Sequence, residues 1–360
     1  MRCNIDYYPL TQPQKGIWYT EKLYPGTSIG TIAATLKLQG DIDYLLLEKA
    51  VNLLVEKNDA IRLRFTQKDN EPYQYVSNYK YKKLQFFDFS QSSSEELFAW
   101  DKARSEEPFD LIDSDLFHFD LIKISDNVGG FFVKMHHLIS DAWSMSIVGN
   151  NIVEYYSKLK NGELIDPSKK PSYLDFILRE NDYFESGRFK SDNDFWTKRL
   201  SAFKEVTTLK PRTSLSLDSK ARRKTHVLPK KLTDKLRKYC SENKVSEYAL
   251  FFAALSMYIN RVSGKEDLTI GTTLLNRTNA KEKATFGMFV STAVPVRVDI
   301  HDDWNLKTFA ESISREILSV LRHQKYPYNL LLKQIREQSN ADNIFDIVLT
   351  YQNSKFMNDS

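Results

Sequence analysis

The hydrophobic positions along the chain follow two different periods, and this alternation predicts a mixed α/β protein. Apolar side chains three and four apart, the spacing of one helix face, occur in residues 43–57, 92–107, 173–184, 194–203, 232–240, 247–261, 306–322 and 329–338. Short runs rich in β-branched and aromatic residues, typical of strands, occur in residues 29–38, 61–65, 73–76, 84–87, 116–124, 130–135, 225–228, 268–275, 289–298 and 345–351. We therefore expect sheets covered by helices.

For two of these segments the pattern also predicts which way side chains point or how deeply the element is buried. Residues 61–65 alternate apolar and basic positions, so a strand there would place Arg62 and Arg64 on one face, opposite the apolar one. The helix at 247–261 is apolar almost all round, which is typical of a buried helix.

The order of elements indicates two domains. Residues 161–172 are rich in Gly, Pro, Lys and Ser, which predicts a linker. The elements after the linker repeat the order of those before it, and 360 residues suffice for two domains. We expect a first domain at 1–165 and a second at 166–360.

Composition narrows the function classes. The net charge of +4, from 51 basic and 47 acidic residues, gives no support for a nucleic-acid partner. Cys3 and Cys240 are the only cysteines, so a disulfide framework and a cysteine zinc site are excluded, and the chain fits a reducing cytoplasm. No apolar run is long enough to span a membrane, so we expect no membrane segment.

The candidate chemistry lies where the strand at 130–135 meets the helix that follows it. His136 and His137 precede Asp141 in the run from Met135 to Ser144. Histidine transfers protons near neutral pH. The N-terminus of the helix beginning near Ala142 favours a developing negative charge. This combination suits acyl transfer through an oxyanion.

From the residues alone, other interpretations stay open. Asp141 or Ser140 can cap the following helix, with the histidines half-buried at the strand end. Asp141 can also pair with an arginine instead of orienting His137. A serine nucleophile has no support because no Gly-x-Ser-x-Gly elbow precedes a helix. We expect no metal, because adjacent histidines seldom share one and no His-Glu-x-x-His occurs.

The run Met135–Ser144 resembles the His-His-x-x-x-Asp-Gly signature of the condensation domains of nonribosomal peptide synthetases. Further family motifs are matched, in the family's order, by Leu10–Trp18, Lys57–Phe65 with Arg62, Ser172–Phe176, Phe195–Trp196, Phe286–Thr292 and His323–Tyr328. The resemblance covers residues 9 to about 353.

This resemblance implies an α/β (α+β) fold of two chloramphenicol-acetyltransferase-like lobes in a V-shaped pseudo-dimer, with the His-His motif in the N-terminal lobe. It implies a channel between the lobes, in which an acceptor aminoacyl thioester attacks a donor acyl thioester to form an amide. Donor and acceptor peptidyl carrier proteins would deliver both groups on phosphopantetheine, the chain itself would bind no cofactor, and an adenylation domain would follow downstream.

The resemblance also implies roles for individual residues. His137 would position or deprotonate the attacking amine, and His136 would support it. Asp141 would be structural and would pair with Arg62. The substrate channel would include Trp143, Ser144, Trp196, Ser291 and Thr292, with a core position as the alternative for Trp196. Ser140 to Ser144 most resembles domains that join an L-configured donor to an L-configured acceptor.

Two of the chain's departures from the family pattern bear on its activity. Ala142 replaces the motif glycine, and a methyl group there would strain the loop if the position requires a positive φ. The chain ends at the last family motif, so we expect a C-terminally truncated second lobe or a fragment of a longer synthetase. Two functions remain as alternatives to amide formation. One is a coenzyme-A-dependent acyltransferase of the same superfold, and the other is a non-catalytic carrier-binding module.

Overall fold

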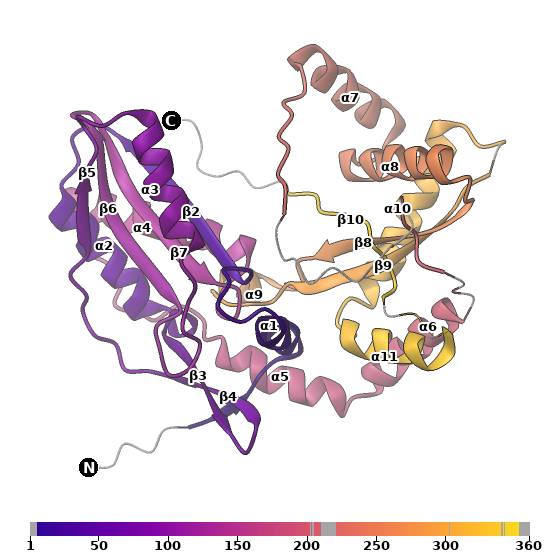
Figure 1. The fold of residues 1–360 in the computed structure, drawn as a ribbon, viewed down its shortest axis with the longest axis horizontal. Helices are drawn as coiled ribbons and strands as arrows, with labels where there is room; N and C mark the ends of the chain where they lie inside the picture. The colour runs from indigo at the N-terminus through magenta and orange to yellow at the C-terminus, as the bar shows by residue number, and fades with distance from the viewer. Residues whose placement is uncertain are drawn as a thin grey trace. The chain divides into compact units, whose positions relative to one another are not determined.

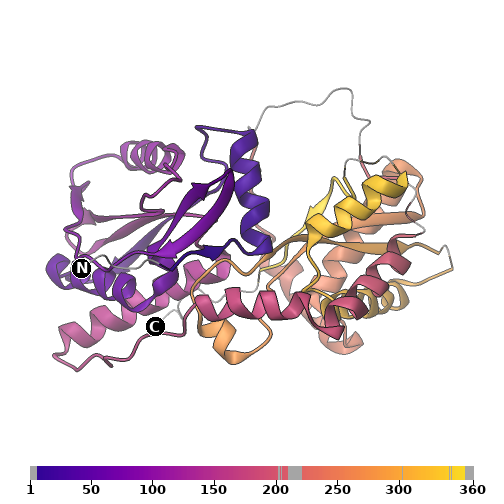
Figure 2. The same ribbon diagram turned by 90° about the horizontal axis from the view of Figure 1, so that it is seen from below.

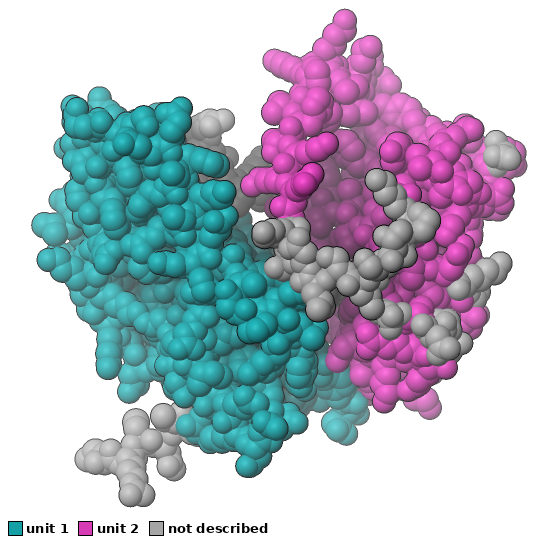
Figure 3. Space-filling view, in the orientation of Figure 1, with its two compact units in different colours: residues 1–185, 277–290, 354–360 teal, residues 186–276, 291–353 magenta. Residues whose placement is uncertain are grey.

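The computed structural model describes residues 6–201, 203, 205–209, 221–301, 303–339, 341 and 343–352, without the side chains of residues 291–293, 338 and 339 (Figure 1). The chain divides into two compact units, coloured separately in Figure 3. The first contains the chain up to Glu185 together with Arg277–Val290, and the second contains Ser186–Asn276 and Ser291–Asn353. The mixed α/β class expected from the sequence is confirmed.

The division into units differs from the predicted boundary at residues 165 and 166. Residues 166–185 belong to the first unit because Tyr173, Phe176 and Ile177 are buried in its hydrophobic core. The segment Arg277–Val290 returns to the first unit for the same reason, since its residues Phe286 and Phe289 join that core. The first unit is therefore discontinuous in sequence.

A four-stranded sheet with the order β2-β7-β6-β5 forms the centre of the first unit. Its strands are β2 (Thr31–Gln39), β5 (Gln85–Asp88), β6 (Phe117–Ser125) and β7 (Val128–His136). Successive side chains of β7 point to opposite faces. Phe131, Val133 and Met135 pack in the main core, which also receives the buried residues of α2 (Tyr44–Lys57) and α4 (Ala142–Lys160). On the other face Phe132 meets Trp100 of α3 (Ser94–Glu106), so the sheet lies between two helical layers (Figure 2).

The remaining elements of the first unit surround this sheet. They are β1 (Tyr8–Pro9), α1 (Gln12–Leu23), η1 (Asp59–Arg62), β3 (Leu63–Lys68), β4 (Glu71–Val76), α5 (Leu174–Phe184) and α9 (Ala280–Ala284). β1, β4 and β3 form a separate small sheet. The strand predicted at 61–65 begins only at Leu63, because residues up to Arg62 form the 3-10 turn η1. Arg62 and Arg64 therefore do not lie on one strand face.

The second unit has its own core around a three-stranded sheet with the order β10-β8-β9. Its elements are α6 (Gly187–Leu200), α7 (Lys230–Asn243), α8 (Glu247–Ser263), β8 (Asp267–Leu274), β9 (Ser291–Asp299), α10 (Leu306–Arg322), α11 (Tyr328–Ser339) and β10 (Val348–Leu349). Residues 225–228 form no strand, and Val227 is 82% exposed. α8 is buried on one face only, since Tyr258 and Val262 are exposed.

Helix α1 is fixed at its N-terminus by side chains from two directions. Thr11 caps the helix, and Gln14 completes a capping box with it. The carboxylate of Glu180 in α5 accepts hydrogen bonds from the Gln12 N–H at 3.1 and 3.0 Å. A carboxylate at this end also complements the helix dipole. Burial nevertheless raises the pKa of Glu180 from 4.5 to about 7, which means that ionising it in the folded protein is costly.

This raised pKa predicts the pH dependence of stability. Between the usual glutamate pKa and about 7, the folded protein binds a proton at Glu180 that the unfolded chain releases. The contribution of Glu180 to stability is thus fully present at low pH and falls as pH rises from about 4.5 towards 7. Urea unfolding of the wild type and of Glu180→Gln measures it. The difference in unfolding free energy between the two should change across this interval, and a constant difference would contradict the raised pKa.

Candidate active site

His136 is the last residue of β7, and its ring is held by hydrogen bonds at both nitrogens. Nε2 lies 3.1 Å from Oε1 of Glu21, and Nδ1 accepts a hydrogen bond from the Leu138 N–H at 3.1 Å. Because Nδ1 is an acceptor, the proton of the neutral ring is on Nε2, where it is donated to the carboxylate. The side chain is only 2% exposed, so the ring of His136 lies inside the corner between β7 and α4.

Gly30 allows Glu21 to reach His136. The Gly30 N–H donates to Glu21 Oε1 at 2.9 Å, and its carbonyl accepts from the His137 N–H at 2.7 Å. A Cβ atom at Gly30 would stand 2.6 Å from His136 Nε2, closer than real Cβ contacts. A glycine is therefore required where the chain from α1 passes the end of β7.

His137 has the opposite tautomer. Its Nδ1 lies 3.2 Å from the carbonyl oxygen of Ser140, so Nδ1 carries the proton and Nε2 carries the lone pair. Burial is the main cause that lowers the pKa of His137, while the hydrogen bond to Ser140 and the charge of Asp141 act in the other direction. His137 is thus neutral near pH 7. Within the described residues no hydrogen bond reaches its Nε2.

Asp141 caps α4 and is paired with a buried arginine. Its Oδ1 accepts from the Ser144 N–H at 2.8 Å, and Arg277 Nη2 lies 2.9 Å from each carboxylate oxygen. The Phe289 N–H donates to Oδ2 at 3.1 Å. Asp141 and Arg277 have side-chain exposures of 1% and 0%, so this is a fully buried ion pair.

The expected pairing of Asp141 with Arg62 was wrong. Arg62 donates to the backbone carbonyls of Val55, Ser77 and Glu56, at 3.2, 2.7 and 3.4 Å, and so fixes the end of α2 and the end of β4. Sequence reasoning overlooked Arg277. The available signal was its position shortly after the apolar strand β8, where a charged side chain becomes buried and then needs a partner.

Ser144 belongs to this clamp of Asp141 and Arg277. Its hydroxyl donates to the Gly287 carbonyl at 2.7 Å and accepts from Arg277 Nη2 at 3.0 Å. Ser144 was expected to line the substrate channel. Because its side chain is 0% exposed, that expectation was wrong. Trp143 is half-buried, and its indole N–H donates to the Lys283 carbonyl at 2.8 Å. Both side chains hold the 277–290 segment against α4.

The N-terminus of α4 also differs from the expectation. Ala142 is the first helical residue, is exposed and is not among the residues with positive φ, so its methyl group strains nothing. The carboxylate of Asp141 already occupies the Ser144 N–H in the first turn. This anion complements the positive end of the helix dipole and takes up one of the N–H groups of the first turn.

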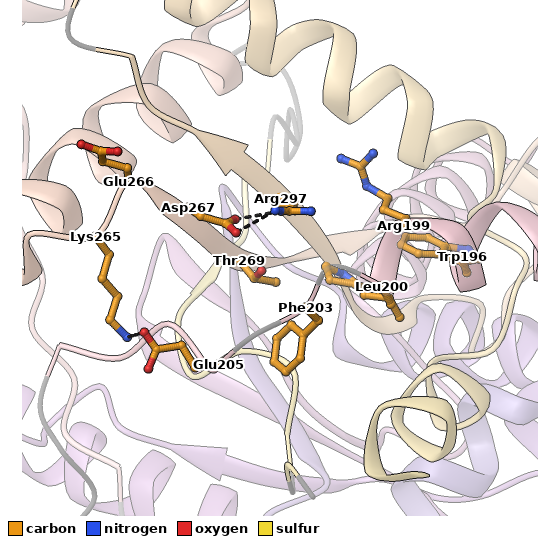
Figure 4. A pocket seen from close by; sticks show the side chains of 11 residues that line it. Trp196, Arg199, Leu200, Phe203, Glu205, Lys265, Glu266, Asp267, Thr269 and Arg297 are labelled. Carbon is orange, nitrogen blue, oxygen red and sulfur yellow. Dashed lines mark hydrogen bonds and ion pairs between the residues drawn. The ribbon is translucent and has the colours of Figure 1, made fainter. Parts of the chain in front are cut away.

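Trp196 is a core residue of the second unit. It is 0% exposed, and its indole N–H donates to the His323 carbonyl at 3.1 Å. It borders a cavity of about 190 Å³ in which Arg297 is paired with Asp267 and Lys265 with Glu205 (Figure 4). Those charges neutralise one another, and no histidine is among the residues that line this cavity. The side chains of Ser291 and Thr292 lie outside the described part of the chain.

Among the residues that the structure describes, no group of three or more His, Cys, Asp or Glu side chains could hold a metal ion. None of the helices in this part of the chain has the length and apolar character needed to cross a bilayer.

Comparison with known proteins adds the evolutionary context. The model of the condensation-domain family matches residues 4–360. Two relatives from Bacillus subtilis (strain 168) are similar along almost the whole chain: surfactin synthase subunit 1, 40% identical over 354 residues, and one of the plipastatin synthase subunits, 38% identical over 348 residues. These alignments cover 97% and 96% of the chain but only 10% and 14% of the relatives, so the chain spans a small part of each.

Solved structures show the same fold. The first condensation domain of the calcium-dependent antibiotic synthetase superposes with a TM-score of 0.84 at 18% identity, over 96% of this chain and 80% of that one. A starter condensation domain of rhizomide synthetase, solved with C8-CoA and Leu-SNAC, superposes with a TM-score of 0.85 at 23% identity, over 96% and 78%.

The clamp generates a first prediction for this site. Asp141→Ala would leave Arg277 buried without a counter-charge, and we expect a loss of about 3–5 kcal/mol in unfolding free energy. In a double-mutant cycle measured by urea unfolding, Asp141→Ala and Arg277→Ala should be strongly coupled. Arg62→Ala is the control, since its effect should add to that of Asp141→Ala within about 0.5 kcal/mol. Coupling of Asp141 to Arg62 instead would reverse our assignment.

A second prediction concerns Glu21. Glu21→Ala removes the acceptor for the Gly30 N–H and the His136 Nε2–H, and we expect a loss of about 1–3 kcal/mol. Glu21→Gln retains an oxygen that can accept both hydrogen bonds, so it should keep most of the stability. Nitrogen-15 NMR of the His136 ring should show Nε2–H in the wild type and in Glu21→Gln. Equal unfolding free energies of Glu21→Ala and Glu21→Gln would exclude the role of Glu21 as the support of His136.

Proposed function

Because this chain belongs to the condensation-domain family of nonribosomal peptide synthetases, we propose that it joins a donor acyl group to the amine of an acceptor aminoacyl group. Both groups would arrive as thioesters on the phosphopantetheine arms of peptidyl carrier proteins. The single observation that carries the proposal is the state of His137: a neutral imidazole whose proton is fixed on Nδ1 and whose Nε2 is free of hydrogen bonds from the described residues.

The geometry of His137 fits a base for the attacking amine. The amine nitrogen attacks the thioester carbonyl carbon, a C–N bond forms, and the C–S bond breaks. His137 Nε2 takes the proton that the amine loses and returns it to the departing sulfur, so that the products are an amide and a free thiol. The carbonyl of Ser140 holds the imidazole in the tautomer that this transfer needs.

The other site residues act through position. His136 fixes the turn between β7 and α4 through the Leu138 N–H, and Ser140 Oγ donates to the His136 carbonyl at 3.1 Å. Asp141 and Arg277 hold the start of α4 in place. These contacts determine where Nε2 of His137 points, and a displacement of the order of 1 Å at such a base can cost about 10²-fold in rate.

The partners follow from the same proposal. Donor and acceptor carrier proteins supply the substrates, the chain needs no cofactor of its own, and an adenylation domain acts downstream. The two cysteines among 360 residues support a cytoplasmic location.

A coenzyme A thioester is the second candidate for the donor. The observation in its favour is the structural likeness to the starter condensation domain of rhizomide synthetase, which was solved with C8-CoA. The acceptor would still be an aminoacyl carrier protein, and the chemistry at His137 would be unchanged, because both donors are thioesters.

Product formation with an aminoacyl carrier protein tests the proposal. His137→Ala should lower the rate by about 10²–10⁴-fold, since it removes the base. His226→Ala, at an exposed histidine of the second unit, is the matched control and should leave the rate unchanged. An acyl carrier and an acyl coenzyme A, offered separately, distinguish the two donors. Carrier binding without any amide product would instead identify a non-catalytic module.

The pH profile gives an independent measurement. Because the pKa of His137 is lowered by burial, the wild-type rate should hold through neutral pH and fall only in acid, as pH drops through that lowered value. A rate that rises as His137 becomes protonated would contradict the role of a base.

A further inference from the structure

The first unit contains a cavity that is separate from the one beside Trp196 in the second unit and that the proposed reaction does not use. It has a volume of about 580 Å³, within the usual range for small-molecule sites. Its lining comes from η1, β3, β4, the loop after β4 and the segment from Asp113 to Phe117, with single residues from neighbouring elements. Four cations line it: Arg62, Arg64, Lys80 and Lys82. No histidine is among its lining residues.

Arg62 is held in place with hydrogen-bonding capacity left over. Three of its five N–H groups donate to backbone carbonyls, so the guanidinium is oriented before any ligand arrives and two N–H groups remain. Within the described part of the chain no carboxylate lies within ion-pair distance of Arg62 or Lys80. Glu56 and Asp59 act on Arg62 only at longer range.

Arg64 and Lys82 have to share one carboxylate. Both form ion pairs with Asp115, and both lie against the ring of Phe117, at 5.9 and 4.8 Å from its centroid. Arg64 is 8% exposed, and burial together with the neighbouring Arg62 lowers its pKa to about 10. Positive charge is thus crowded on this wall of the cavity.

The acidic residues of the cavity compensate only in part. Asp113 accepts hydrogen bonds from the hydroxyls of Tyr75 and Thr66, at 3.1 and 3.3 Å, and Asp6 is exposed. In the cavity of the second unit, by contrast, Arg297 and Lys265 each have a carboxylate of their own. Among the described residues, four cations therefore face three carboxylates in the cavity of the first unit, and Arg62 and Lys80 are in no ion pair.

We propose that the cavity between β3, β4 and the loop after β4 binds a small molecule that carries a diphosphate group. A guanidinium with a fixed orientation presents paired donors to phosphate oxygens, and a lysine adds a mobile point charge. A diphosphate offers oxygens to more than one of these cations at once, which a single phosphate does less well. Inorganic pyrophosphate and nucleoside polyphosphates both contain this diphosphate group.

Calorimetric titration of the full chain with inorganic pyrophosphate and with ATP tests this site, with sodium chloride at matched ionic strength as the blank. Lys80→Glu reverses one unpaired charge on an exposed side chain, so the fold should survive. We expect its affinity for both probes to fall at least about tenfold. Lys238→Glu, at a lysine side chain 75% exposed on α7, makes the same charge change elsewhere and should bind as the wild type does.

Two outcomes would overturn the proposal: no saturable binding of either probe to the wild type, or the same affinity for Lys80→Glu and Lys238→Glu. Tighter binding of ATP than of pyrophosphate would identify a nucleotide as the ligand, and equal binding would identify the diphosphate alone. Because binding is measured directly, the result is independent of whether the chain forms an amide.

Discussion

The buried ion pair between Asp141 and Arg277 is the interaction on which the candidate site depends. Burying two charges costs several kcal/mol each, and only close pairing with further hydrogen bonds offsets that cost. Here the offset is extensive, because Arg277 also donates to the carbonyls of Glu282, Thr285 and Gly287 and lies 4.0 Å from the ring centroid of Phe289. The pair joins the start of α4 to the 277–290 segment, and it fixes the α4 end of the turn that carries His137.

The two adjacent histidines differ because their hydrogen-bond partners differ. A carboxylate and a backbone N–H engage both nitrogens of His136, so its ring has no capacity left. A backbone carbonyl engages one nitrogen of His137 and leaves the other as an acceptor. Chemically identical side chains thus become a support and a candidate base. Glu21 of α1 and the Leu138 N–H of the β7–α4 turn engage His136, and the Ser140 carbonyl of the same turn engages His137.

Local pattern was enough to predict most elements and the corner itself, since amphipathic spacing and a strand-to-helix junction are properties of neighbouring residues. Pairing across long distances was not predictable in the same way. The sequence resemblance offered Arg62 as the partner of Asp141, whereas Arg277, 136 positions away, is brought there by the core contacts of Phe286 and Phe289. Ser144 was likewise misjudged, and for Trp196 the alternative of a core position was the right one, because a motif indicates that a side chain matters without indicating whether it is buried.

The discontinuity of the first unit has a consequence for how the protein is made. Its core is left incomplete by residues up to Glu185, because Arg277–Val290 supplies Phe286, Phe289 and the partner of Asp141. During synthesis the ribosome must therefore deliver most of the second unit before this clamp can close, and contacts of such long sequence separation form late. Until then Asp141 lacks its buried partner, so the candidate site cannot be completed before the chain has been synthesised as far as Val290.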